Sequence, residues 1–304
     1  MSPKPPIPNW TNLLLIIVSF AATCVLLFLG SHAIWSWTVI YGAILAVVMV
    51  CTYSLIHEAV HGILHSNERV NTFLGRFLCL IFVSPFTFLK HCHLRHHKKN
   101  RTDEEMWDLY YEHESAAKKY GTLYGMMLGL GYFSLWLSVI LFAIWPRLIH
   151  TKFFLDKKEL AGFIRGSDRR DKVLKSRLES LVVIFFQVSL FYVLNVDPVR
   201  WLVMYSMVGF VWSSQNYVNH AFSPRDIIQG AHNLAVPGWL KYVYLNFNLH
   251  LAHHQDPKVP WIHLPKYVKD GPPRITFLRN YIRLWKGPQI TREPAPEEGE
   301  AAEM

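Results

Sequence analysis

Long apolar segments separated by short polar links make up the N-terminal part of the chain. The first segment runs from about Trp10 to Gly30 and the second from about Trp35 to Ile56. Each is long enough to cross a bilayer as a helix. The link between them contains no Lys or Arg, and basic residues mark the cytoplasmic side of a membrane protein. We therefore expect this link to face outward, with the N-terminus and the chain after Ile56 in the cytoplasm.

A second pair of apolar segments lies further along the chain, from Leu181 to Leu194 and from Val199 to Trp212. The residues between them read Asn-Val-Asp-Pro, a turn-forming link that suits a tight helical hairpin. The two pairs together predict an all-α, polytopic membrane protein with two transmembrane helical hairpins.

Two other apolar segments are predicted to be re-entrant or interfacial helices. The segment from Tyr120 to Trp145 is long enough to span, but basic residues stand on both of its flanks, so a single crossing would place one basic flank outside. We predict that it turns back as a re-entrant or interfacial hairpin, with an ordinary span as the alternative. The glycines that favour this turn are Gly125, Gly129 and Gly131. The segment from Phe73 to Leu89, interrupted by Ser84 and Pro85, is predicted to lie at the interface.

The composition agrees with a membrane protein, because 51% of the residues are hydrophobic. A formal net charge of +9 is also found in nucleic-acid-binding proteins. Here, however, the basic residues lie between and after the apolar segments, as in cytoplasmic loops, so we predict no nucleic-acid partner. The four cysteines have no CxxC spacing and are expected to be buried free thiols.

The domain organisation is predicted to be simple. We expect one membrane-embedded domain over residues 1–292 and a disordered tail over residues 293–304, where Glu, Pro and Ala predominate. We find no internal repeat and no segment that suits a second soluble domain, such as a fused haem or flavin module.

Histidine is the residue type whose distribution is most unusual, because most of the 16 histidines crowd into a few short segments. The three clusters are His57-Glu-Ala-Val-His61 with His65 one further turn on, His93-Leu-Arg-His96-His97, and His250-Leu-Ala-His253-His254. Residues three or four apart share one helix face, so each cluster can aim its imidazoles at a common point, as a metal requires. All three follow apolar segments on the predicted cytoplasmic side, where they would form a histidine-rich cap.

A single histidine is more often a structural or solvated group than a ligand. We expect this role for the isolated residues His32, His113, His150 and His263. The HxxHH pattern occurs twice in this chain, which is improbable by chance. A purely structural or solvated role therefore does not explain the clusters.

The first cluster also matches HExxH, the zinc-protease motif in which the glutamate, here Glu58, activates water. A catalytic zinc site needs only three protein ligands, so a metalloprotease leaves the two HxxHH clusters unexplained. The clusters hold too many histidines for one tetrahedral ion and favour two metals. A histidine-rich metal transporter is a further alternative, but its ligands are expected within the spans rather than at their ends. Imidazole binds iron, zinc, copper and nickel alike, so the ligands leave the metal open.

The order of the clusters resembles the membrane fatty acid desaturase superfamily. In that family an HxxxH box follows a pair of spans, an HxxHH box comes shortly after it, and another HxxHH box follows a second pair of spans. The resemblance covers roughly Trp35 to Pro265. The second box continues into Asn100-Arg-Thr-Asp103-Glu104, which is similar to the polar extension in bacterial members, and the third is followed by spaced prolines and Leu-Pro.

The resemblance implies a non-haem site with two iron ions and O2 as co-substrate. In the family an NxxxH pattern just after the last span supplies a further ligand, and Asn216-Tyr-Val-Asn219-His220 matches it. The ligand set implied by the resemblance is His57, His61, His93, His96, His97, His220, His250, His253 and His254. Asn216 is implied as a partner of one iron through water.

The function implied by the resemblance is oxygen-dependent desaturation of a fatty acyl chain, carried by a lipid, an acyl carrier or as the free acid. A related lipid hydroxylase, carotenoid ketolase or alkene-forming oxidase remains an alternative, because all begin with hydrogen abstraction. The third box begins with histidine rather than glutamine, and we find no fused cytochrome b5 domain. Electrons are therefore expected from a separate ferredoxin or similar carrier. The implied location is a bacterial inner membrane, with the active site facing the cytoplasm.

Overall fold

The structure is a computed structural model that describes residues 5–156, 161, 164–269 and 274–296, and it is predominantly α-helical, as predicted. Of the tail predicted to be disordered, residues 297–304 lie outside the described part. The four cysteines are free thiols, as expected; Cys79 is buried, whereas Cys24, Cys51 and Cys92 are only half-buried.

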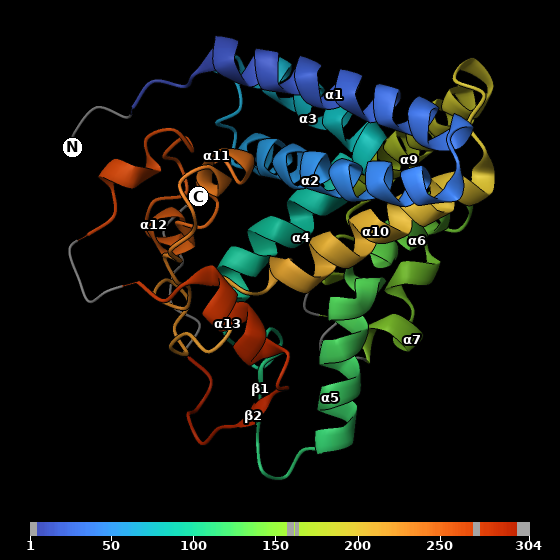
Figure 1. The fold of residues 1–304 in the computed structure, drawn as a ribbon. Helices are drawn as coiled ribbons and strands as arrows, with labels where there is room; N and C mark the ends of the chain where they lie inside the picture. The colour runs from blue at the N-terminus through green and yellow to red at the C-terminus, as the bar shows by residue number, and fades with distance from the viewer. Residues whose placement is uncertain (1–4, 157–160, 162–163, 270–273, 297–304) are drawn as a thin grey trace.

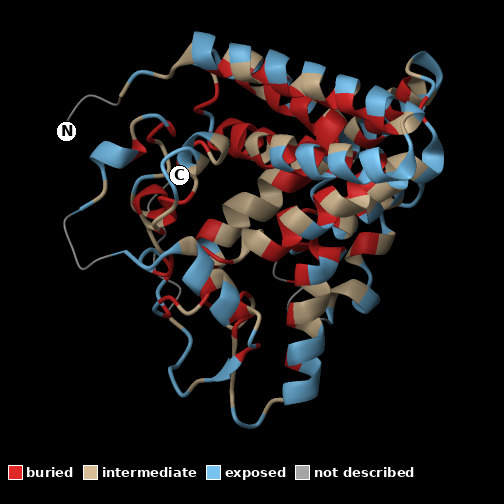
Figure 2. Ribbon diagram, in the orientation of Figure 1, coloured by how far each residue is buried: buried red, intermediate tan, exposed pale blue. Residues whose placement is uncertain are grey.

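The first two apolar segments form α1 (Asn9–His32) and α2 (Trp35–Val60), which lie side by side (Figure 1). On α1 the buried residues recur every three or four positions and face the rest of the molecule. The opposite face of α1 is exposed (Figure 2) and bears apolar side chains such as Leu14, Ile17 and Phe28. An exposed apolar face of this kind suits contact with lipid rather than water.

A sharp break separates α3 (Glu68–Phe82) from α4 (Phe86–Lys99), and the two helices are bent by 101° relative to each other. At the break Val83 has a left-handed backbone with a φ of 58°, and Pro85 stands where its missing N–H costs no helical bond. The interruption predicted from the sequence is therefore present. It sets the direction of α4, which carries the second histidine cluster.

The segment from Tyr120 to Trp145 is not the predicted hairpin. Helix α5 (Ala116–Gly125), a π-helical turn (η1, Met126–Leu130) and α6 (Gly131–Ile144) form one continuous apolar segment, which is kinked at Gly129. The φ of 124° at Gly129 is readily adopted only by glycine. The glycines thus produce a kink where we expected a reversal.

Contacts at Glu104 and His91 nevertheless join the chain before this segment to the chain after it. After α6 come a short 3-10 turn (Leu148–His150) and α7 (Lys152–Leu155), and the chain then returns to α4. There Arg165 pairs with Glu104 at 3.3 Å, and its carbonyl oxygen lies 3.0 Å from the Nε2 atom of His91. Glu104 thus pairs both with Arg95, which precedes the segment, and with Arg165, which follows it. By length and composition alone the segment is also a candidate span.

The later pair of apolar segments forms α9 (Arg170–Val193) and α10 (Pro198–Asn216). Asp197 caps α10 by accepting a hydrogen bond from the backbone N–H of Arg200. These two helices do not pack against each other along their lengths, so the predicted compact hairpin is not formed. Helix α6 packs against both of them, and α10 packs mainly against α2. Among the described residues the candidate spans by length and composition are α1, α2, the segment from α5 to α6, and α9. Helix α10 is not one of these candidate spans, because its last four residues, Ser-Ser-Gln-Asn, are polar.

The chain after α10 forms a cap of short elements over one end of the helical bundle (Figure 1). They are α11 (Leu240–Val243), α12 (His250–Gln255), a 3-10 turn (Leu264–Lys266), α13 (Phe277–Leu284) and β2 (Gln289–Ile290). Strand β2 pairs in parallel with β1 (Leu109–Tyr110), so the C-terminal part is tied to the chain that follows the second histidine cluster. Helix α11 contacts α2, and Ser54 on α2 donates a hydrogen bond to the carbonyl oxygen of Tyr244.

Candidate metal centre

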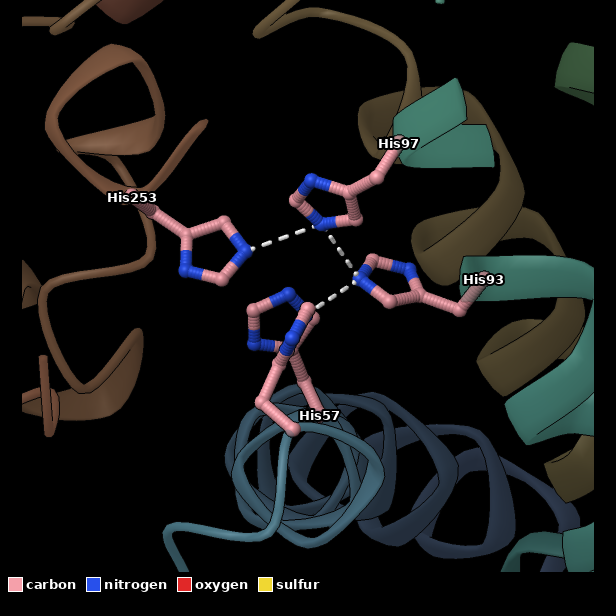
Figure 3. Close-up of side chains that lie close together, drawn as sticks. His57, His93, His97 and His253 are labelled. Carbon is pink, nitrogen blue, oxygen red and sulfur yellow. Dashed lines mark hydrogen bonds between the residues drawn. The ribbon is translucent and has the colours of Figure 1, made fainter. Parts of the chain in front are cut away.

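Nine histidines gather in the interior in two groups, each able to hold a metal ion. Within each group, one nitrogen from every residue lies within 4.8 Å of the others. The first group, part of which Figure 3 shows, is His57, His61, His93, His97 and His253. The second group is His96, His220, His250 and His254. The structure therefore brings together the same nine residues that the family resemblance implies.

The division into two groups follows from helix geometry. On a helix, residues four apart differ in direction by about 40°, whereas neighbours differ by about 100°. His93 and His97 on α4 accordingly join one group, and His96, between them, joins the other. On α12, His250 and His254 share the second group and His253 joins the first. Each HxxHH box thus gives ligand candidates to both groups.

The spacing of the nitrogen atoms fits metal binding. In the first group the Nε2 atoms of His61 and His93 are 2.8 Å apart, and those of His93 and His97 are 3.0 Å apart. In the second, the Nε2 atoms of His96 and His220 are 3.1 Å apart. Two imidazole nitrogens bound at right angles to one ion, each at about 2.1 Å, are separated by about 3 Å.

Unpartnered nitrogens also point to metal ions. The Nε2 atoms of His57 and His254 are buried and have no hydrogen-bond partner among the described residues. Buried polar atoms almost always have a hydrogen-bond partner or a metal ion bound to them. Each histidine group contains at least one buried nitrogen without a hydrogen-bond partner in the described part of the chain, and such a nitrogen is available to bind a metal ion. The residues present therefore fit two imidazole-bound metal ions.

Two histidines of the second group are oriented through their other ring nitrogen. The Nδ1 atom of His96 is hydrogen-bonded to the carboxylate of Glu105, and that of His220 lies 2.8 Å from the carbonyl oxygen of Gly230. Asn100 donates a hydrogen bond to the same Gly230 oxygen. Partners of this kind fix the ring and its tautomer, which leaves Nε2 free for a metal.

Burial favours the neutral form of five histidines that lie outside the candidate spans. Loss of hydration lowers the pKa values of His61, His220, His250, His253 and His254 below the ordinary histidine range, and neighbouring histidines lower them further. Only a neutral imidazole has a lone pair for a metal ion. These five rings are therefore ready to bind at neutral pH.

His220 lies in a turn rather than on a helix. Helix α10 ends at Asn216, and the backbone N–H of His220 bonds to the carbonyl of Tyr217. The turn is held from outside by Asn280 of α13, whose amide donates to the carbonyls of Val218 at 2.7 Å and Ala221 at 3.1 Å.

A buried ion pair holds the same turn on its other side. The guanidinium of Arg101 donates to the carboxylate of Asp108, to the hydroxyl of Tyr217 and to the carbonyl of Ser223. Arg101 and Asp108 are both fully buried. The chain after the second histidine box is thereby locked to the chain that carries His220. The polar run from Asn100 to Glu104 was the sequence signal for this contact, whereas nothing in the sequence indicated Asn280, Gly230 or Glu105.

Glu58 lies outside both groups. Its buried carboxylate accepts a hydrogen bond from the backbone N–H of Trp261 at 2.9 Å and so joins α2 to the chain after the third box. A metalloprotease of the HExxH type needs this carboxylate beside a metal-bound water. In this chain Glu58 has a structural contact instead.

Other histidines also lie outside both groups. His65 does not continue the first cluster by another turn, because α2 ends at Val60 and the chain turns at Gly62, where φ is 75°. The isolated histidines have structural or surface contacts, as expected: His32, His150 and His263 bond to Phe28, Ser167 and Pro6, and His113 stacks on Tyr111.

A cavity of about 320 Å³ adjoins the two groups. His93, His96, His220 and His250 form part of its wall. Most of the remaining wall is apolar and comes from α4, α5 to α6 and α10, with Ile149, Phe154 and Ile164 from the chain that follows α6. The histidine groups therefore border a space suited to an apolar ligand rather than to water.

The chain matches the family model described as "Fatty acid desaturase" over residues 33–285. This match covers most of the chain, which therefore belongs to the fatty acid desaturase family. A search of the curated proteins finds no match. The chain is thus a member of an oxidoreductase family that acts on lipids in membranes, with histidine groups suited to metal binding.

Proposed function

We propose that this protein is an oxygen-dependent fatty acyl desaturase in which the nine gathered histidines hold two iron ions. The observation that carries the proposal is the position of both histidine groups on one apolar cavity of about 320 Å³. His57, His61, His93, His97 and His253 would hold one ion, and His96, His220, His250 and His254 the other. Asn216 would bind one ion through water, and its place among the residues that line the cavity supports this role.

Iron bound there would supply the oxygen chemistry that removes two hydrogen atoms from adjacent methylene groups. The protein's own contribution begins with binding. The acyl chain lies between apolar side chains such as Leu135, Met127 and Phe88, and their burial with the substrate provides the binding free energy. The walls also exclude water, which protects the methylenes and the reactive site from side reactions.

Position along the chain is set by the contacts of the histidines. Because His96 is fixed by Glu105 and His220 by Gly230, the second group has a defined place on the cavity wall. Only methylenes that reach this place are close enough to react. The cavity wall and these two contacts therefore select which carbon atoms are oxidised.

The electrons come from a separate one-electron carrier such as a ferredoxin, and the active site faces the cytoplasm of a bacterial inner membrane. The cytoplasmic side rests on the basic residues that flank the apolar segments, and the separate carrier rests on the third histidine box, which begins with His250 rather than glutamine. The acyl group enters as a lipid, an acyl-carrier thioester or a free fatty acid.

Lipid profiling of a host that expresses the chain tests this proposal. We expect new unsaturated acyl chains with one double-bond position, formed only in the presence of oxygen. His220→Ala is the matched inactive control, because it removes one member of the second histidine group. New hydroxylated or keto lipids would show the related hydroxylase or ketolase reaction instead, and unchanged lipids from a folded, iron-loaded protein would contradict an oxidase.

A further inference from the structure

A second, smaller cavity lies beside the large one. Its volume is about 20 Å³, and its wall comprises Val50, Tyr53, Ser54, Trp212, Gln215, Asn216, Asn219, Tyr244 and Phe247. Four of these residues, Tyr53, Trp212, Asn216 and Phe247, line both cavities. A polar cavity needs roughly 10–15 Å³ to hold one water molecule. The smaller cavity is therefore large enough for water but too small for a lipid.

Two buried polar atoms belong to the residues that line this cavity. The indole Nε1 of Trp212 is a donor and the amide Oδ1 of Asn219 is an acceptor, and neither has a hydrogen-bond partner among the described residues. Asn219 is 3% exposed and Trp212 is 7% exposed. Buried polar groups bond to protein or to ordered water. A donor and an acceptor on one small cavity are complementary to a water molecule.

The cavity also connects the histidine groups with less buried polar residues. The ring of Phe247 contacts His57 of the first group and His250 of the second, with ring centroids 4.9 and 4.5 Å apart. On another part of the wall, Gln215 and Tyr244 are only half-buried, and the hydroxyl of Tyr244 donates a hydrogen bond to the amide oxygen of Gln215. The wall of the smaller cavity thus includes both a residue in contact with the histidines and polar residues that are less buried.

We propose that the smaller cavity is a water-binding site through which protons reach the metal centre. The proposal rests on the proposed desaturase function. One turnover converts R–CH2–CH2–R′, O2, two protons and two electrons from the carrier into R–CH=CH–R′ and two water molecules. The acyl chain fills the apolar cavity, so the protons need a separate polar route. Water held by Trp212 and Asn219, next to Asn216, provides it.

The first test is a structure of the purified protein at a resolution that shows ordered water. We expect density for water within hydrogen-bonding distance of both Trp212 Nε1 and Asn219 Oδ1. Asn219→Leu should remove this water, because it replaces the acceptor with an apolar group of similar size. Asn219→Ser is the matched control, since it keeps an oxygen acceptor and leaves room for an additional water.

The second test measures coupling of oxygen use to product. If protons reach the centre slowly, O2 that has taken up one electron from the carrier leaves as superoxide, which needs no proton there. Two superoxide ions and two protons of the surrounding water then give hydrogen peroxide and O2, and no substrate is oxidised. Asn219→Leu should bind iron as the unmodified protein does, yet release several-fold more peroxide for each double bond formed. Asn219→Ser should resemble the unmodified protein. If Asn219→Leu loses iron, Gln215→Leu is judged by the same ratio, because Gln215 also lines the smaller cavity and is not adjacent to a histidine in the sequence.

Absence of water between Trp212 and Asn219 in the unmodified protein would overturn the proposal, as would unchanged coupling in the leucine variant that retains iron. Failure of the desaturase function itself is a different outcome, recognised by the absence of any oxygen-dependent lipid product. The density measurement is independent of turnover and therefore distinguishes the two failures.

Discussion

Asn280 offers the sharpest test of how the second histidine group is held. Replacing it by leucine keeps the size of the side chain but removes the hydrogen bonds to Val218 and Ala221. The Ala221 carbonyl keeps a contact with His232 Nε2 at 3.1 Å, whereas the Val218 carbonyl has no other side-chain donor in the described part of the chain. A buried carbonyl without a donor costs about 1–3 kcal/mol. We expect Asn280→Leu to weaken the turn that carries His220 by about 2 kcal/mol.

The loss should appear first in metal content. Partners that orient a ligand contribute about 10–100-fold to metal affinity. We therefore expect iron in the purified Asn280→Leu protein to fall from about two atoms per chain toward about one, because only the four-histidine group depends on this turn. Element analysis measures the ratio, and thermal unfolding followed by circular dichroism shows whether the helices remain.

Arg279→Gln is the matched control, since Arg279 is the exposed neighbour of Asn280 on the same helix. It should keep its iron and its melting temperature. The reasoning fails if Asn280→Leu binds as much iron as the control and forms product at the same rate. A uniform loss of both irons with a large fall in melting temperature would show that Asn280 supports the whole cap rather than the turn.

The other predictions concern the histidines, Glu58 and the topology. His220→Ala should abolish desaturation, measured by lipid profiling, and lower the bound iron, measured by element analysis. His113 is exposed and stacks on Tyr111, so His113→Ala should change neither. Glu58→Gln should retain part of the activity, because an oxidase does not use Glu58 to activate water; complete loss with full metal content would favour hydrolysis. Reporters placed near Lys99 and near Arg165 should both be cytoplasmic, and opposite sides would show that the segment between them crosses the membrane. The metal-free protein should lose thermal stability as the pH falls below about 6.5. Histidines of the unfolded chain then bind protons, whereas the buried rings of the folded protein, whose pKa values are lowered, do not. A melting temperature that stays constant down to pH 5 would contradict this.

Much of the centre was predictable because local helix geometry determines it. Residues three and four apart on α4 and α12 must point to the same region, whatever the rest of the fold. The two long N-terminal helices were equally predictable, since a continuous apolar run of span length leaves few alternatives. His220 needed the family pattern, because a single histidine in a turn has no periodicity to reveal it.

The contacts that the sequence did not indicate are all tertiary. Asn280 lies some sixty residues after the turn it supports, and Glu105 meets His96 only because the chain reverses after α4. The kinked segment from α5 to α6 was misjudged for another reason. Glycines permit both a reversal and a kink, and packing of α6 between α9 and α10 favours the continuous helix.

The measurement that tests the central claim most directly is the metal content of the purified protein. Nine histidines in two groups, seven of them buried, exceed what one ion coordinates, so we predict about two iron atoms per chain. One zinc atom per chain and no iron, in a protein that is folded and membrane-inserted, would contradict the di-iron desaturase.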